Sequence, residues 1–212
     1  MFGVAVFQGV NPATHNAWPQ ELRVIDHRIA TFLCGRNESL DMNGSDLHPA
    51  KLPAELLLRD CEIRHERRRG PGGQHRNKTE SAVVLHHTPT GVEGQAAERR
   101  SQHDNHRVAV SRLRVNLALE VRTASAADAI PTVKWSSRCH GGRIGCNPKH
   151  EDFAPLLAEA LDVLHARHGH VSSSAEQLGV TPSQLVKFLK YEHRALLLVN
   201  QERGRLGQHP LE

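Results

Sequence analysis

The sequence predicts an α+β fold in which a small antiparallel sheet carries one long packed helix and is followed by a helical domain with a helix-turn-helix. Residues 61–96 hold short apolar runs separated by glycine and proline, which favours strands, and residues 102–122 repeat an apolar residue every four positions. After residue 151 the apolar pattern turns helical. We therefore expect an irregular extension (1–50), an α+β domain (51–122), a basic linker (123–150) and a helix-turn-helix-like domain (151–212).

The apolar residues of the extension follow no regular spacing, and glycine, asparagine and proline interrupt it. Met42 lies just before the first expected element, and Met1 is the only other methionine. Our hypothesis is that translation begins at Met42; an intact mass that begins at Met1 would contradict it.

The elements of the α+β domain follow in chain order. A short helix is expected from Pro53 to Arg59, because proline suits a first turn and the leucines favour helix. Strands are expected at Cys61–His65, Ala82–His87 and Val92–Ala96, the last two joined by a Pro-Thr-Gly turn.

A long helix is expected from Gln102 to Arg122. Ser101 and Asp104 resemble a capping box at its start. Its apolar stripe should pack on the sheet, and consists of Ala109, Leu113, Leu117 and Val121.

The linker combines small residues with four basic ones and one tryptophan. Its cations could follow an RNA backbone: Lys134, Arg138, Arg143 and Lys149. Trp135 either stacks on a base or anchors the linker onto the protein. We prefer the anchor, because a single aromatic ring offers little surface for stacking on bases.

The last domain begins with an apolar stripe from Leu156 to Leu164, which predicts a helix ending before Gly169. The stretch from Ala175 to Leu185 then has the spacing of a helix-turn-helix, with a second helix reaching Tyr191. A second helix that reads nucleic acid would project Ser183, Gln184, Lys187 and Lys190. The domain's net charge is −2, so RNA contact and a purely structural bundle both stay open.

The most informative segment runs from Gly70 to Lys78. Its glycines allow close approach of the backbone to a partner, and Gln74 can donate and accept hydrogen bonds but cannot titrate, so chemistry there would rest on positioning and donation. A surface turn between two strands is the plain alternative. A phosphate-cradling nest is another, although the P-loop and GxGxxG spacings do not occur here.

The run GPGGQHRNKTESAV at residues 70–83 is followed by TPTG at 88–91 and ERRSQH at 98–103. Together these motifs resemble the catalytic domain of class I peptide chain release factors and of their codon-independent ribosome-rescue relatives. The resemblance covers residues 53–122. It implies that Gly72, Gly73 and Gln74 are catalytic, entering the peptidyl transferase centre to promote hydrolysis of the ester between the nascent peptide and P-site tRNA.

In that family the backbone N–H of the glutamine stabilises the developing oxyanion or the leaving 3′ hydroxyl, and no metal or organic cofactor is needed. The implied partners are the ribosome, through its large-subunit rRNA, and P-site peptidyl-tRNA, with the protein a monomer. The implied RNA-binding residues are Arg64, Arg67, Arg68, Arg69, His75, Arg76, Asn77, Lys78, Arg99, Arg100 and Gln102. For any single arginine among them, a solvated surface position is the alternative.

Two departures from the family pattern bear on codon dependence. Codon-reading factors surround the catalytic domain with a large decoding domain, whereas the amino-terminal segment here is short and irregular; its Pro12-Ala13-Thr14 matches a stop-codon tripeptide by coincidence. Short rescue factors use a basic tail, but residues 200–212 carry two arginines and two acids. We expect codon-independent rescue, and keep as alternatives a non-hydrolytic RNA-binding or regulatory protein and an atypical stop-codon factor.

Composition is consistent with an RNA partner. Residues 59–122 carry 13 basic against 8 acidic residues and residues 123–150 carry 4 against 1, within a net charge of +4. The four scattered cysteines suit free thiols in a reducing cytosol, and the gap between Cys139 and Cys146 does not fit a zinc site. Without a secretory signal or an apolar run of the ~20 residues that a membrane span needs, we expect a cytoplasmic protein.

Overall fold

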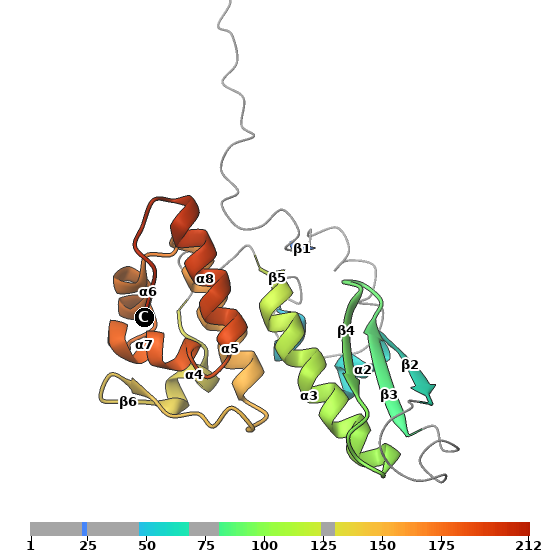
Figure 1. Ribbon diagram of the computed structural model, residues 1–212. Helices are drawn as coiled ribbons and strands as arrows, with labels where there is room; N and C mark the ends of the chain where they lie inside the picture. The colour runs from blue at the N-terminus through green and yellow to red at the C-terminus, as the bar shows by residue number, and fades with distance from the viewer. Residues whose placement is uncertain (1–22, 25–46, 68–80, 124–129) are drawn as a thin grey trace, which may run out of the picture.

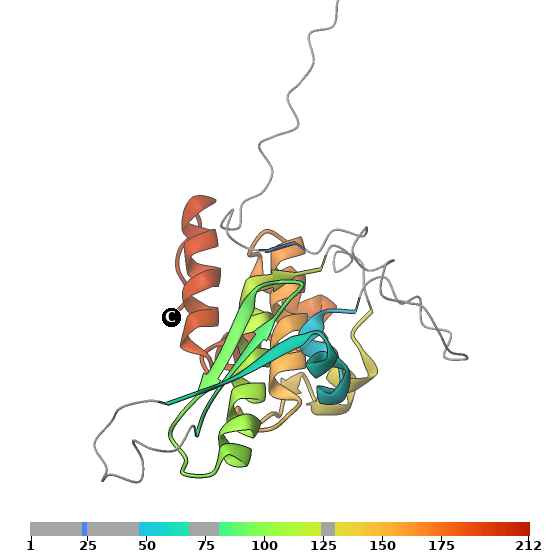
Figure 2. The ribbon, with the colours of Figure 1, turned by 90° about the vertical axis from the view of Figure 1, so that its right-hand side faces the viewer.

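The computed structural model describes residues 23–24, 47–67, 81–123 and 130–212. In these parts of the chain a three-stranded sheet lies on one side of a long central helix, α3, and the carboxyl-terminal helices lie on its other side (Figure 1). Figure 2 shows the same arrangement turned by a quarter, with the sheet in front of α3 and α5.

The sheet is antiparallel, in the order β2-β3-β4, with β2 at Cys61–Glu66, β3 at Ala82–His87 and β4 at Val92–Ala96. These strands confirm the predicted ones, with β2 longer by its last residue. Burial explains the patterns: β3 is central and almost wholly buried, whereas burial in β4 alternates between buried and exposed residues. The short helix α2 (Ala54–Arg59) precedes β2 and follows Pro53, as predicted.

Helix α3 (Gln102–Glu120) packs on the sheet through its predicted stripe, and Ala109, Leu113 and Leu117 are fully buried. The hydroxyl of Ser101 accepts a hydrogen bond from the backbone N–H of Asp104 at 3.3 Å, which confirms the cap. The closest approach is at Gly94 in β4. A Cβ there would lie 2.5 Å from the Ala109 carbonyl oxygen and 2.5 Å from the Leu113 nitrogen.

Helix α3 ends earlier than predicted. Val121 takes an extended conformation, and β5 (Val121–Arg122) pairs in parallel with β1 (Arg23–Val24). The buried Arg122 guanidinium donates hydrogen bonds to the carbonyls of Ala118 (2.7 Å) and Leu119 (2.8 Å), so it satisfies groups that a helix end leaves unpaired. Burial lowers the pKa of Arg122 to about 10, opposed by the charge of Asp162.

A short 3-10 helix, η1 (Pro49–Lys51), packs against α3 and α5. Its cap His48 is fully buried, although the sequence places it at the end of an irregular extension. His48 Nδ1 accepts from the Ala50 N–H at 3.1 Å, and His48 Nε2 lies 3.1 Å from the Val121 carbonyl oxygen. Since one nitrogen accepts, the ring is neutral and Nε2 is the donor.

The carboxyl-terminal part contains α4 (Val133–Arg138), β6 (Cys139–His140), β7 (Arg143–Ile144), α5 (Phe153–Ala166), α6 (Val171–Gln177), α7 (Pro182–Leu189) and α8 (His193–Arg205). Helix α5 is buried from Phe153 to Leu164 and packs on α3. Helices α6 and α7 follow the predicted order, with Gly179 in the left-handed conformation (φ 67°) between them. Their assignment as a helix-turn-helix stays a prediction.

Trp135 is fully buried, which confirms the anchor interpretation. Its indole N–H donates to the Leu178 carbonyl at 2.8 Å, and its ring meets Phe188 edge-on at 5.8 Å between centroids. Two buried carboxylates of α5 hold the neighbouring chain: Asp162 accepts from the Thr123 hydroxyl at 2.6 Å and Glu159 from the Thr132 hydroxyl at 2.6 Å. This part of the chain is therefore packed against α5 and α7.

We expect Gly94→Ala to destabilise the fold by about 1–3 kcal/mol or more, because the new methyl group meets backbone atoms of α3 that cannot move independently. Gly204→Ala is the matched control, since Gly204 lies in α8 with open space where a Cβ would go. That change should leave stability unchanged or raise it by about 0.4–1 kcal/mol. Urea unfolding monitored by circular dichroism measures both; equal effects would contradict the close packing of α3 on β4.

Stability should fall on mild acidification because of His48. Burial lowers its pKa from 6.5 to about 4 in the folded protein, so the unfolded chain binds the extra proton between those values and stability is lost as the pH falls through this window. The expected loss from His48 between about pH 7 and pH 5 is about 2 kcal/mol. In urea unfolding, His48→Gln should flatten this slope, and His140→Gln, at an exposed position, should retain it. Part of the pH dependence should remain in His48→Gln, because burial also lowers the pKa of His165 to about 4.

Candidate functional site

The predicted catalytic loop connects β2 to β3. The paired strands end with Glu66 opposite Ala82, so both ends of the connection, at Arg67 and Ser81, emerge at the same edge of the sheet. The residues of the loop itself lie outside the described part of the chain. The predicted roles of Arg68, Arg69, Gly72, Gly73, Gln74, His75, Arg76, Asn77 and Lys78 therefore stay predictions.

Asn105 holds the carboxyl end of this connection against the start of α3. Its amide Nδ2 donates to the Ser81 carbonyl at 2.6 Å and to the Arg99 carbonyl at 2.9 Å, and its Oδ1 accepts from the Arg99 N–H at 2.9 Å. Asn105 is fully buried. The sequence prediction missed this residue, although a signal exists: it continues the stripe of Ala109 one turn back as a polar residue on an apolar face, and buried amides require partners.

The amino end of the connection is also tied to α3. The Gln102 side-chain amide donates to His65 Nδ1 at 2.6 Å, which joins the start of α3 to β2. His103 and His106 lie nearby on the same helix. The pKa of His106 is lowered by burial and by the neighbouring His103 and His65, which favours its neutral form. The predicted site residue Gln102 thus contacts protein at the base of the loop.

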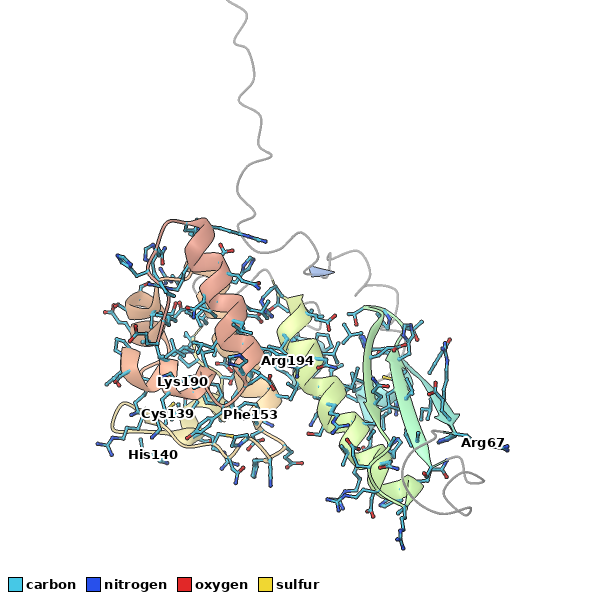
Figure 3. The ribbon with its side chains drawn as sticks, in the orientation of Figure 1. Arg67, Cys139, His140, Phe153, Lys190 and Arg194 are labelled. Atoms are coloured by element: carbon cyan, nitrogen blue, oxygen red, sulfur yellow. The ribbon has the colours of Figure 1, made fainter. Side chains whose placement is uncertain are left out.

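The other predicted cations in the described chain surround this base. Arg99 and Arg100 are exposed just before α3, and Arg67 is exposed after β2, at the end of the molecule opposite Lys190 and His140 (Figure 3). Arg64 pairs with Glu62 at 3.0 Å, with both side chains more than half exposed (59% and 58%). Exposed pairs contribute little, so Arg64 can exchange this partner for a phosphate at small cost.

A groove of about 930 Å³ continues from Arg99 along α3 toward residues 148–154. Basic side chains predominate on its polar walls, which include Arg99, Asp104, Arg107, Arg114, Lys149 and Glu151. The Arg114 guanidinium donates to the Leu52 carbonyl, and burial lowers its pKa, opposed by Glu151 and Asp152. The site can therefore attract polyanions along α3 while the sheet edge presents the loop.

Within the described ranges, no three histidine, cysteine, aspartate or glutamate side chains are grouped so as to hold a metal ion. None of the helices in those ranges has both the length and the apolar character to cross a membrane.

Comparison with known proteins matches residues 51–140 to the RF-1 domain. Peptide chain release factor 1 of Acidiphilium cryptum is 48% identical over 106 residues, which are 48% of this chain and 30% of that protein. Peptide chain release factors 2 of Variovorax paradoxus and of an Acidovorax species are each 48% identical over 65 residues, 30% of this chain and 18% of theirs. No solved structure matches the chain.

The chain thus spans less than a third of the length of these curated relatives. The matched region contains the whole β2-β3-β4 sheet, α3 and the loop between β2 and β3. Residues 51–140 thus form an RF-1 domain, similar to that of peptide chain release factors.

Proposed function

We propose that this protein hydrolyses the ester bond of peptidyl-tRNA on the ribosome. One observation carries the proposal: the matched domain has Gly72-Gly73-Gln74 in the connection between β2 and β3, and the ends of that connection are tied to the start of α3. A loop on a fixed base can carry a reacting group into a narrow site with its position preserved.

In this reaction water adds to the ester carbonyl carbon, the bond to the tRNA 3′ oxygen breaks, and that oxygen leaves with a proton. The backbone N–H of Gln74 donates to the developing negative charge, and Gly73 permits the close approach. Most of the remaining site is ribosomal RNA and tRNA. Arg64, Arg67, Arg99, Arg100 and Gln102 would contact phosphate around the loop base, each supplying donors suited to phosphate oxygen.

We further propose that the protein acts independently of the codon, as a monomer that rescues stalled ribosomes. In support, residues 141–212 beyond the matched region fold into helices that pack directly against α3, so the surface beside the catalytic domain belongs to this helical part. Arg194 of α8, for example, donates to Asn116 of α3 at 2.8 Å. These helices would provide recognition in place of codon reading.

A second candidate is codon-dependent termination. It is favoured by the names of the relatives, peptide chain release factors 1 and 2. The two candidates differ in one observable quantity, the dependence of release on the codon in the A site.

Gly73→Ala should reduce peptide release by about a hundredfold to a thousandfold, the usual cost of losing one preorganised donor. The measurement is release of labelled peptide from ribosomes that carry peptidyl-tRNA in the P site, with A sites empty, sense-filled or stop-filled. Gly204→Ala serves as the control and should release at the wild-type rate.

Codon-independent release by the wild type supports rescue, whereas release with a stop codon alone assigns the protein to the second candidate. A wild type without release in any state would contradict both and favour a non-hydrolytic RNA-binding protein.

Asn105→Ala should slow the hydrolytic step by up to about a hundredfold at saturating protein, because the Ser81 end of the loop loses its tie and the reacting group is misplaced. The affinity for ribosomes should change little. Asn116→Ala is the matched control, since Asn116 also lies on α3 and donates to a backbone carbonyl, that of Glu93, at 2.6 Å. Single-turnover release rates compare the two; equal losses would show that Asn105 acts through general stability alone.

A further inference from the structure

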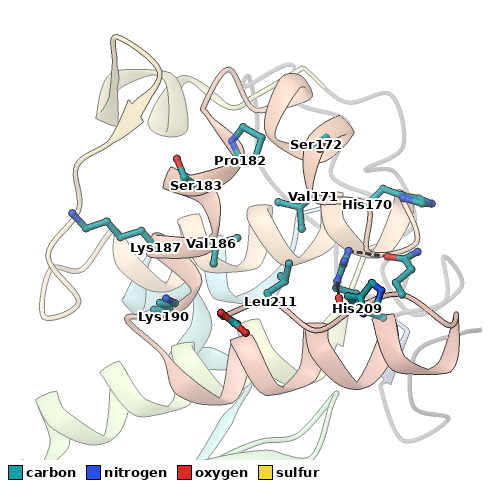
Figure 4. Close-up of a pocket in the computed structure, with 13 residues that line it drawn as sticks. His170, Val171, Ser172, Pro182, Ser183, Val186, Lys187, Lys190, His209 and Leu211 are labelled. Carbon is teal, nitrogen blue, oxygen red and sulfur yellow. Dashed lines mark hydrogen bonds between the residues drawn. The ribbon is translucent and has the colours of Figure 1, made fainter.

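A second cationic surface lies on α7, and its Lys190 is at the end of the molecule opposite Arg67 (Figure 3). Ser183, Lys187 and Lys190 project from this helix at the edge of a groove of about 960 Å³ (Figure 4). These three positions are spaced four and three residues apart, so they form one stripe on the helix. We call them the α7 surface. Both lysines are exposed, and among the described residues neither ammonium group forms an ion pair.

The groove beside this stripe combines an apolar floor with polar walls. Leu211 points toward Val171 across the floor, and Val186 lies beside them (Figure 4). The returning tail forms one wall: Asn200 Oδ1 accepts from the Leu211 N–H at 2.7 Å, and Arg203 donates to the His209 carbonyl at 2.8 Å. The groove is therefore part of the folded structure and holds its shape through hydrogen bonds.

Burial of carboxylates changes which charged groups of this part of the protein lie at its surface. Residues 151–212 contain six basic and eight acidic residues, which suggests an acidic module. However, Glu159, Asp162 and Glu202 are buried, at 6%, 2% and 0% exposure. Only five acids remain against six bases outside the core, so the composition conceals a surface that is not acidic.

A neighbouring hairpin adds a further exposed cation. The Thr181 N–H, just before α7, donates to the Gly142 carbonyl at 2.9 Å, which docks the turn between β6 and β7 against the start of α7. Arg143 follows in that hairpin and is exposed. By contrast, Lys134 and Arg138 are occupied by Asp152, at 3.0 Å and 2.5 Å. Among the described residues, the exposed cations beside α7 that lack an ion pair thus include Arg143, Lys187 and Lys190.

We propose that the α7 surface, with Arg143, binds the phosphate backbone of RNA. Unpaired ammonium groups, an adjacent guanidinium and a serine hydroxyl match the contacts that position a protein on a nucleic-acid backbone. The groove floor offers apolar area beside those phosphate contacts. The choice of RNA over another polyanion rests on the proposed function, because a ribosome presents RNA to every factor that binds it.

The test uses the full chain with Lys187→Glu and Lys190→Glu combined, and a short fluorescein-labelled RNA hairpin as the probe, read by anisotropy over a salt series. Losing two phosphate contacts should weaken binding about tenfold or more at low salt and flatten the plot of log affinity against log salt by about 1.5. Arg205→Glu is the control, because this exposed arginine at the end of α8 does not line the groove. The changes that it causes in log affinity and in the salt slope should each be no more than about a third of those in the lysine variant.

Unchanged affinity and slope in the lysine variant would overturn the proposal, as would an equal loss from Arg205→Glu or the lack of RNA binding by the wild type. A DNA duplex that binds more tightly than the RNA through these lysines would overturn the assignment to RNA. Peptide release is assayed separately on the same variants. If the wild type binds RNA through the lysines but releases no peptide, RNA binding by the α7 surface is supported and the proposed hydrolysis is contradicted.

Discussion

The close contact of α3 with β4 at Gly94 is the constraint on which the position of α3 on the sheet depends. The backbones of α3 and β4 meet there without a Cβ between them. This close approach fixes both the distance of α3 from the sheet and its position along β4. One consequence is at the start of α3, where Gln102 and Asn105 reach the two ends of the β2–β3 connection. Another is at its end, where Arg122 closes the helix and the chain turns toward α5.

The opposite face of α3 supports the helical part through α5. Its two buried carboxylates are costly to bury, and each is satisfied by a threonine hydroxyl and backbone N–H on the segment that leaves α3. This arrangement joins the RF-1 domain to the carboxyl-terminal helices through polar contacts as well as apolar packing. It also keeps these two carboxylates away from the surface of the helical part.

Much of the fold could be predicted from the sequence, because the apolar residues of β3, β4 and α3 follow clear strand or helix patterns and these elements have clear turn or cap residues. The end of α3 could not, since Val121 and Arg122 leave the helix for a pairing with Arg23–Val24 that no local pattern shows. Two-residue strands are too short to have a period. The catalytic role of the loop is a prediction from its residue types, whereas Asn105 was missed because its partners lie 24 and 6 residues away. Likewise, burial of Glu202 and Asp162 is a tertiary property that composition does not report.

In the proposed function, the loop whose two ends are tied to the start of α3 carries Gln74 to the ester bond. The most direct measurement is the structure of the full chain on a ribosome with a non-hydrolysable peptidyl-tRNA in the P site. Gln74 should then lie with its backbone N–H within hydrogen-bonding distance, about 3 Å, of the linkage to the terminal ribose, while Asn105 retains its contact with Ser81. A complex in which the loop lies away from the peptidyl transferase centre, with the protein held only through its carboxyl-terminal helices, would contradict the claim.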